Sequence, residues 1–234
     1  MVLAGPGSGK TLTIVKRIEY MIKKHHVNPQ EILVVTFTKA AAREMQERFF
    51  YLMKRRDIPV TFGTFHSIFY GILKWAYHLS AASFFNEIDR IKLVEHIAEE
   101  QNLGMDQELR LDILQEIGRF KNLNIPMEEF TPGLHQISKE RFQDMFEAYE
   151  SEKERAGKLD FDDMLVRCFR LFQNHPDILA KWQKRFPYIM VDEFQDINPV
   201  QYEVIRMLSS KQKNLFVVGD DDQSIYRFRG AEPS

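Results

Sequence analysis

The sequence predicts an α/β protein whose parallel sheet is interrupted by an all-helical insertion. At both ends of the chain, short apolar strands alternate with amphipathic helices, which is typical of a parallel sheet with right-handed crossovers. Between about residues 71 and 160 the strand signals vanish while helical periodicity continues. We therefore expect an α/β domain formed by residues 1–70 and 161–234, with residues 71–160 inserted as a helical subdomain.

The first α/β segment is expected to begin with a strand that is cut short at Val2-Leu3, before a glycine-rich loop at residues 5–9. A helix over residues 11–24 has an apolar face, and Asn28-Pro29 end it. The remaining elements expected here are a buried strand at residues 32–37, a helix at 40–54, a short strand at 59–63 and a helix from about residue 67.

The helical subdomain and the second α/β segment follow from the same signals. Phe142, Met145, Phe146 and Tyr149 recur at helical spacing and predict a helix over residues 139–155. Other helices are expected at residues 86–102, 108–122, 161–172, 176–185 and 199–208, and strands at 188–191 and 214–218. Because ligands of parallel sheets bind at the carboxyl ends of the strands, the loops near Lys10, Thr38, Asp192 and Asp220 should converge.

The bulk composition is that of an ordinary globular protein. The chain has 234 residues, of which 44% are hydrophobic and 28% charged, so it is long enough for a substantial core. No apolar run approaches the roughly 20 residues of a membrane span, and the first residues lack the basic and apolar regions of a signal peptide. We expect a cytoplasmic protein with no membrane partner.

The charge and the cysteine content exclude some kinds of site. A net charge of −2 disfavours tight tracking of a phosphate backbone, although a single strand can also be held by bases stacking on aromatic rings. Cys168 is the only cysteine and lies at helical spacing among apolar residues, which predicts a buried thiol and excludes an internal disulfide. With one cysteine, the seven histidines form no zinc pattern.

The strongest motif is a phosphate-binding loop at the start of the chain, with alanine in the first glycine position. Its glycines allow backbone N–H groups to surround phosphate oxygens, and the following helix adds the positive end of its dipole. Lys10 would place a charge between the outer phosphates, and the Thr11 hydroxyl would bind Mg²⁺. The residues expected to bind ATP are Ala4, Gly5, Pro6, Gly7, Ser8, Gly9, Lys10 and Thr11.

A second motif completes the expected machinery. The apolar strand at residues 188–191 delivers Asp192 to the metal edge, with Glu193 next to it. Asp192 would bind the metal with Thr11, and Glu193 would orient and deprotonate the attacking water. An apolar strand before Asp-Glu is a weak signal alone, but an upstream phosphate loop strengthens it, because both loops must meet at one end of the same sheet. Hydrolysis of ATP with Mg²⁺ is the reaction that these two motifs predict.

Further motifs narrow the class of ATPase. They are Asp192-Glu193-Phe194-Gln195-Asp196, residues 218–231, Thr36-Phe37-Thr38 with Ala41-Ala42-Arg43-Glu44-Met45, Thr64-Phe65-His66-Ser67 and Leu159-Asp160-Phe161-Asp162-Asp163. On these motifs the chain resembles superfamily 1 DNA helicases of the UvrD/Rep/PcrA type, in the family's order and over essentially the whole length, with the helical block matching least. The resemblance implies a RecA-like P-loop NTPase sheet.

The resemblance also implies roles for individual residues. Gln223 would sense the γ-phosphate and join Glu193 and Lys10 in catalysis. The residues expected to contact single-stranded DNA are Phe37, Thr64, His66, Tyr226, Phe228 and Arg229. Alternatives stay open at three of them, because Phe37 and Phe228 could be core residues and His66 could be a hydrogen-bonded structural residue.

Departures from the family pattern qualify these roles. Phe228 stands where the family usually has Trp, and Leu12 stands where close members carry Arg after the loop threonine. Lys39-Ala40 replaces a common Asn-Lys, which moves a positive charge by one residue. The family places a helix with an adenine-reading Gln before the first strand and a second motor domain, with arginine fingers, after the last motif. Both are expected to be missing here, so this chain alone should bind ATP–Mg²⁺ weakly, lack efficient turnover and not unwind DNA.

Three interpretations of the parent protein follow. The first is an ATP-dependent 3′-to-5′ DNA helicase or translocase acting on single-stranded DNA, or on DNA with a 3′ single-stranded tail, together with a second motor domain of the same polypeptide. The second is the motor part of an AddA/RecB-like helicase–nuclease. The third is a DNA-binding module that uses nucleotide only as a switch, which the presence of Asp192, Glu193 and Gln223 disfavours.

Overall fold

The computed structural model describes residues 2–3 and 9–220. Within this part of the chain, five strands form one parallel sheet in the order β1-β5-β4-β2-β3. The strands are β1 (Val2–Leu3), β2 (Ile32–Thr36), β3 (Thr61–Thr64), β4 (Tyr188–Val191) and β5 (Leu215–Gly219). The predicted α/β class with a parallel sheet is therefore confirmed.

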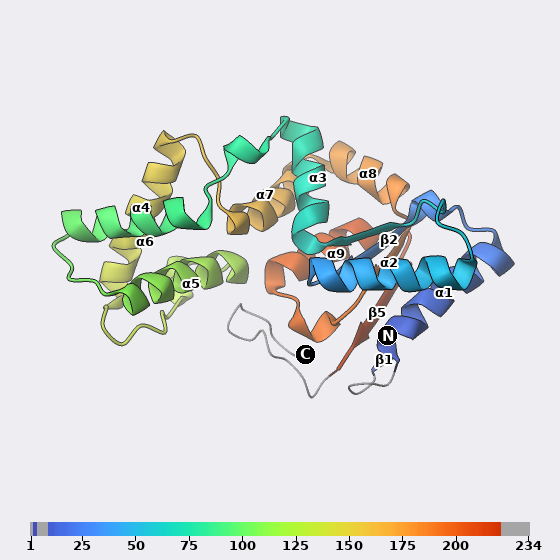
Figure 1. Cartoon of the computed structure of the whole chain (residues 1–234). Helices are drawn as coiled ribbons and strands as arrows, with labels where there is room; N and C mark the ends of the chain where they lie inside the picture. Colours follow the sequence, from blue (N-terminus) through green and yellow to red (C-terminus); the bar gives the residue numbers. More distant parts are fainter. Residues whose placement is uncertain (1, 4–8, 221–234) are drawn as a thin grey trace.

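Helices cover both faces of the sheet, because its central strands are apolar on both sides. Ile32 and Val34 of β2 pack on one face with α1 (Lys10–His25) and α2 (Lys39–Met53). Leu33 and Val35 pack on the other face, where the covering helices are α3 (Phe65–Tyr77), α7 (Phe161–Asn174), α8 (Pro176–Arg185) and α9 (Pro199–Ser209). Figure 1 shows the two helical layers on either side of the strands.

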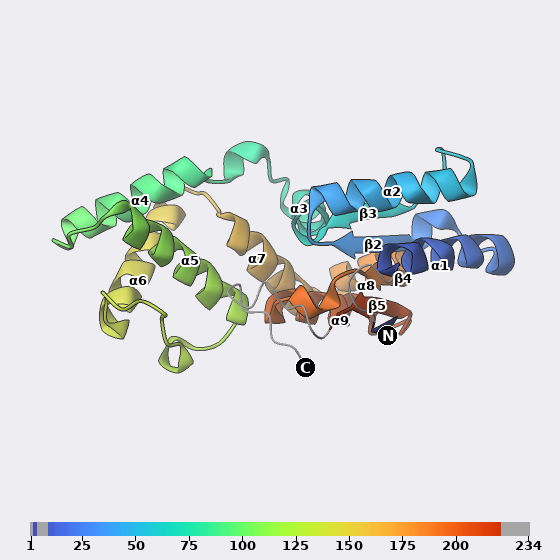
Figure 2. The ribbon, with the colours of Figure 1, turned by 60° about the horizontal axis from the view of Figure 1, so that its bottom comes forward.

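The remaining helices form a separate group with their own core. These are α4 (Glu87–Glu100), α5 (Gln107–Leu123) and α6 (Lys139–Arg155), which bury Ile97, Ile113, Phe142 and Tyr149 against one another. Figures 1 and 2 place this group beyond α7, at the opposite end of the molecule from α1 and α2. Helix α7 contacts α5 of this group as well as α3 and α9 of the sheet layer, so it belongs to both packing units.

The chain enters and leaves the helical group at one place. The segment before α4 and the segment before α7 lie side by side, joined by a parallel bridge between Phe84 and Leu159. The Leu159 N–H donates to the Ser83 carbonyl at 2.9 Å, and the Phe85 N–H donates to the Leu159 carbonyl at 2.8 Å. Helix α3 runs to Tyr77 and buries Ile72 and Leu73 in the core beside the sheet.

Several element boundaries differ from the sequence-based expectations by one or two residues, and capping side chains account for two of them. The helix expected from residue 40 begins at Lys39, because the Thr38 side chain accepts from the Ala41 N–H. The helix expected from residue 67 begins at Phe65, because Thr64 and Ser67 form a capping box. Among the described residues, no helix has both the length and the hydropathy of a membrane span.

Candidate functional site

The candidate site lies at the carboxyl edge of the sheet, where α1 begins. Gly9 precedes the helix with a φ of 86°, in the left-handed region that glycine adopts without strain. No side chain among the described residues caps α1, so the positive end of its dipole and its first N–H groups are suited to an anion. Lys10 is the first residue of the helix, and Thr11 follows, half-buried in the same turn.

Lys10 reaches across this edge to residues that follow β4 and β5. Its ammonium nitrogen lies 3.1 Å from Glu193 Oε2 and 3.9 Å from Asp220 Oδ2, and its side chain is 10% exposed. The lysine therefore sits within a partly buried group of carboxylates. A phosphate at the start of α1 would offer the same ammonium a competing set of oxygens.

Asp192 and Glu193 follow β4 and differ in environment. Asp192 is 4% exposed, and its backbone N–H donates to the Val35 carbonyl of the neighbouring strand at 3.0 Å. Burial, with the nearby Glu193 carboxylate, raises the pKa of Asp192 to about 6. Glu193 is more accessible, with 38% of its side chain exposed.

The backbone of Glu193 is held in a strained conformation. Its φ of 51° and ψ of 48° lie in the left-handed region, which non-glycine residues rarely adopt. The 3₁₀ turn Phe194–Asp196 follows directly, with the Asp196 N–H donating to the Glu193 carbonyl at 2.9 Å. The turn directs the Glu193 side chain toward Lys10 instead of continuing the strand. Strain of this kind is often retained where a side chain must point into a site.

A divalent cation fits these residues chemically. Among the described residues, Asp192 Oδ1 is buried and has no hydrogen-bond partner, which is costly unless a ligand satisfies it. Carboxylate and hydroxyl oxygens are the ligands that Mg²⁺ prefers. Asp192 and the hydroxyl of Thr11 are the residues here that would hold it.

The other predicted phosphate-site residues lie outside the described part of the chain. These are Ala4, Gly5, Pro6, Gly7, Ser8 and Gln223. Three of the predicted DNA-contacting residues, Tyr226, Phe228 and Arg229, also lie outside it. Of the loops expected to converge, the structure brings together Lys10, Asp192, Glu193 and Asp220. Thr38, which is the N-cap residue of α2, lies at the same edge of the sheet.

A groove adjoins this edge on the side of the helical group. Its volume is about 640 Å³, and residues from the sheet layer and from α4, α5 and α7 line it. Phe37, Thr64 and His66 are among the lining residues from the sheet layer, and Arg90, Asn122 and Phe161 are among those from α4, α5 and α7. The three predicted DNA-contacting residues in the described part therefore line one cavity.

The three residues do not have equal local roles. Phe37 is half-buried and packs edge-on against Phe65 at a ring distance of 5.6 Å. Thr64 is 6% exposed and caps α3, because its hydroxyl accepts from the Ser67 N–H at 3.2 Å. The His66 ring faces the half-exposed Phe161 ring edge-on at 6.4 Å. Thr64 thus has a structural function that is sufficient to explain its burial, while His66 and Phe161 present ring surface to the groove.

Sequence reasoning assigned no role to the helical-group residues of this groove. Asp162 is held by Asn122, whose side-chain amide donates to it at 2.8 Å, and by Arg90 at 3.6 Å. Gly118 of α5 lies so close that a Cβ there would be 3.0 Å from Asp162 Oδ2. The sequence does contain the motif with Phe161 and Asp162, but that motif supported only the family resemblance and indicated no role in the groove.

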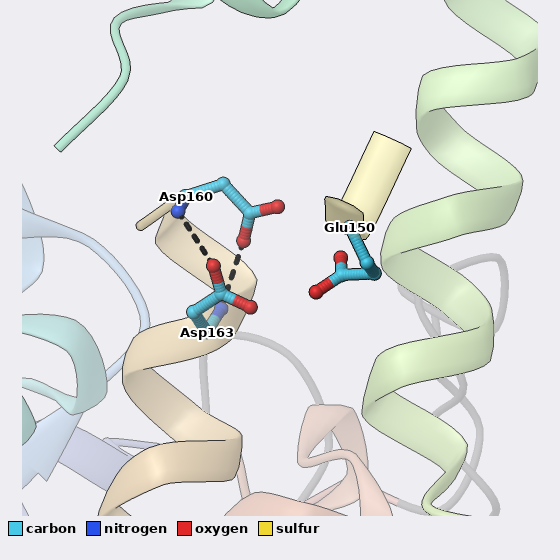
Figure 3. Close-up of side chains that lie close together, drawn as sticks. All are labelled: Glu150, Asp160 and Asp163. Carbon is cyan, nitrogen blue, oxygen red and sulfur yellow. Dashed lines mark hydrogen bonds between the residues drawn. The ribbon is translucent and has the colours of Figure 1, made fainter. Parts of the chain in front are cut away.

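A cluster of charged side chains, most of them buried, includes Lys121 and Asp163, the sequence neighbours of the groove residues Asn122 and Asp162. Figure 3 shows its three carboxylates, Glu150, Asp160 and Asp163, whose oxygens lie within 4.8 Å of one another. Asp160 and Asp163 form the capping box of α7. The ammonium groups of Lys121 and Lys153 each contact all three carboxylates, at 2.5 to 3.1 Å. These ammonium groups occupy the position that a metal ion would take, so we interpret the cluster as structural.

Mutual attraction in this cluster overcomes the cost of burial. Burial alone would raise the pKa of Asp160, but Lys121, Lys153 and Arg90 outweigh it and hold that pKa well below its usual value. For Lys121, burial favours the neutral amine, yet the carboxylates around it raise its pKa well above the usual value. Both groups are therefore charged at neutral pH.

Comparisons with known proteins agree with these features. The family model of the UvrD/REP helicase N-terminal domain matches residues 1–234. A putative ATP-dependent DNA helicase, YjcD, of Bacillus subtilis (strain 168) is 41% identical over 100% of this chain and 31% of its own length. The ATP-dependent DNA helicase PcrA of the same organism is 36% identical over 99% of this chain and 32% of its length. DNA helicase II of Escherichia coli (strain K12) is 35% identical over 99% of this chain and 33% of its length. The chain spans about a third of the length of these relatives.

Proposed function

The chain belongs to the UvrD/REP helicase N-terminal domain family, and from this premise we propose that it forms the ATP-binding part of an ATP-dependent DNA helicase that moves 3′ to 5′ on single-stranded DNA. The observation that carries the proposal is the contact between Lys10 and Glu193, which are 183 residues apart in the sequence. It joins the start of α1 to the end of β4, as a phosphate site and a hydrolytic carboxylate require. The relatives named above are described as DNA helicases, which supports this choice among ATPases.

The chemistry at this edge follows from the charges of the chain's own residues. Lys10 exchanges its contact with Glu193 for phosphate oxygens bound at the start of α1. The released Glu193 carboxylate then orients a water molecule and accepts its proton as the water attacks the terminal phosphorus. Asp192 and Thr11 would hold Mg²⁺, and the ion would supply positive charge that offsets the charge of the phosphates. Gln223 completes the proposed catalytic set from outside the described residues.

The groove beside this edge is the proposed path of single-stranded DNA. Phe37 and His66 present aromatic surface on which bases can stack, a contact worth about 1–3 kcal/mol per base in such sites. Tyr226, Phe228 and Arg229 extend the same proposal. Since the chain has a net charge of −2, stacking should contribute more to binding than phosphate contacts do. The second motor domain of the same polypeptide, with its arginine fingers, is proposed to close over the nucleotide.

Replacing Glu193 with Gln tests the proposal in the gene product that carries this chain. The variant should bind ATP but lose DNA-stimulated hydrolysis by about 10²–10⁴-fold, because the amide cannot accept the water proton. Glu44→Gln is the matched control, because Glu44 is a 61% exposed side chain on α2 that pairs with Arg48 of the same helix. Hydrolysis and unwinding that persist unchanged in Glu193→Gln would refute the motor function and favour a nucleotide-switched binding module.

The polypeptide of residues 1–234 allows a second test. By itself it should bind ATP–Mg²⁺ weakly and show no DNA-stimulated turnover comparable with an intact helicase, because an arginine finger supplies about 10³–10⁵ in rate. Turnover that matches an intact helicase would contradict the need for a second domain. A helicase–nuclease parent is the alternative that a nuclease assay on the gene product would distinguish.

A further inference from the structure

Gln195 connects the catalytic edge of β4 to the end of β5. It lies in the 3₁₀ turn after Glu193, and its side-chain amide nitrogen donates to Glu193 Oε2 at 2.9 Å. Its side-chain oxygen accepts from the Asp220 backbone N–H at 2.8 Å. Strands β4 and β5 are neighbours in the sheet, so one amide group spans the gap between their carboxyl ends.

The orientation of this amide is determined by its partners. A backbone N–H can only donate, so the oxygen of the Gln195 amide must face Asp220, and the NH₂ group must then face Glu193. The same nitrogen lies 3.4 Å from Asp196 Oδ2. A glutamate at this position could accept from Asp220 but would turn a second carboxylate toward Glu193. Glutamine therefore satisfies both contacts, whereas its acidic counterpart satisfies one and opposes the other.

The space for this amide depends on Gly219. A Cβ at residue 219 would lie 2.8 Å from Gln195 Oε1 and 3.4 Å from the Gln195 backbone nitrogen. Gly219 is not among the described glycines with positive φ, so glycine is needed here for room and not for its backbone conformation. Any side chain at residue 219 would push the Gln195 amide away from Glu193.

We propose that Gln195 is a positioning residue for Glu193, held in place by the backbone of Asp220 and by the absence of a side chain at Gly219. The proposal rests on the function proposed above, in which Glu193 accepts a proton from water. While Lys10 is bound to phosphate, Gln195 keeps Glu193 Oε2 in a defined place and leaves the other oxygen for the water molecule. It also ties the position of Glu193 to the end of β5, after which the chain continues to Gln223.

The test is a double-mutant cycle of Gln195→Ala and Gly219→Ala in the gene product that carries this chain. Each single variant should lower the kcat of DNA-stimulated ATP hydrolysis about 10–100-fold, because a misplaced catalytic group costs about that much, while KM for ATP stays within about 3-fold. The double variant should be no slower than Gln195→Ala, since the shortened side chain at position 195 leaves room for the added methyl group. A purely structural role would lower the amount of folded protein without this separation of kcat from KM.

Gln183→Ala is the matched control. Gln183 is another buried glutamine that bridges two partners, the Met207 carbonyl at 2.8 Å and the Ser210 hydroxyl at 3.1 Å, away from the catalytic edge. It should leave kcat per folded molecule unchanged. A kcat within about 3-fold of the unmodified protein in both Gln195→Ala and Gly219→Ala would overturn the proposal, and so would rate losses that multiply in the double variant. Glu193→Gln, measured in parallel, distinguishes a failure of the Gln195 proposal from a failure of the proposed function. If Glu193→Gln also hydrolyses ATP normally, the proposed function itself fails.

Discussion

Replacing Lys153 with Met should destabilise the protein strongly, because this lysine lies among buried carboxylates. Its side chain is 3% exposed, and its ammonium contacts Glu150, Asp160 and Asp163 at 2.9, 3.1 and 2.5 Å. Methionine fills a similar volume but removes the charge, so the three carboxylates would keep Lys121 as their ammonium partner, with Arg90 acting on Asp160 from farther away. Removing one partner from a buried ion pair costs about 3–5 kcal/mol.

The destabilisation caused by Lys153→Met should lie near the lower end of the range of about 3–5 kcal/mol. Glu150 is 30% exposed, so water can reach one of the three carboxylates and screen part of the repulsion. A loss of about 3 kcal/mol is a large part of the roughly 5–15 kcal/mol that stabilises a typical domain. For a chain of this length it corresponds to a fall in Tm of about 6–12 °C.

The destabilisation caused by Lys153→Met should become smaller as the pH falls. In the unmodified protein the pKa of Asp160 is lowered, so the stability that it contributes is fully present above an unfolded pKa of about 3.9 and is lost as the pH falls below it. In the variant, unbalanced negative charge should raise the pKa of Asp160. The difference in unfolding free energy between the two proteins should therefore narrow as the pH falls into the acid range, because Asp160 is protonated at a higher pH in the variant than in the unmodified protein.

Denaturant titrations at several pH values, each followed by two spectroscopic probes, would measure the difference in unfolding free energy between the two proteins. Far-UV circular dichroism reports on helices throughout the chain, whereas Trp75 and Trp182 lie on α3 and α8, outside the helical group, with their rings 6.0 Å apart. Lys16→Met is the matched control, because Lys16 is 55% exposed and pairs with Glu19 on the surface of α1; it should change stability by less than about 0.5 kcal/mol. Equal small effects of the two substitutions, or a difference that widens as the pH falls, would refute the reasoning.

Three further predictions concern single residues. Cys168 is fully buried and burial raises the pKa of its thiol, so a disulfide reagent at about pH 8 should label it only as fast as the protein unfolds; rapid labelling of the native protein would contradict this. The pKa of Asp192 is raised to about 6, so the affinity for Mg²⁺ measured by calorimetry should fall as the pH drops below this value, because protons compete with the ion, and Asp192→Asn should remove that dependence. Thr64→Ala should cost about 1 kcal/mol in a denaturant titration through loss of the α3 cap; an unchanged midpoint would show that the cap contributes nothing.

Elements with a strong apolar repeat were predictable from sequence. The helices Lys139–Arg155 and Pro176–Arg185 and the strand Tyr188–Val191 have the boundaries expected for them. Each is defined locally, by helical periodicity, by a proline at the first turn or by an apolar run before an acidic pair. Boundaries moved where a threonine directly before the helix caps it and sets its first residue, as at Thr38 and Thr64.

The candidate site was partly predictable for a topological reason. Lys10 and Glu193 could be expected to meet, because carboxyl ends of parallel strands share one edge of a sheet. The contacts of Gln195 could not be inferred, since the approach of Gly219 depends on how β5 lies beside the turn after β4. The pairing of Lys121 with Asp160 also depends on helix packing between residues 39 positions apart.

The strand order affects the order in which parts of the chain can fold during translation. Strands β4 and β5 separate β1 from β2 in the sheet, yet they are translated about 150 residues after β2. At roughly 5–20 residues per second, a ribosome needs about ten to thirty seconds to supply them. During that time the apolar strand Ile32–Thr36 has only β3 as a partner in the final sheet, whereas α4, α5 and α6 are completed before β4 begins and can pack on one another. Co-translational folding should therefore begin in the inserted helices, and the nascent sheet should be the part that chaperones bind.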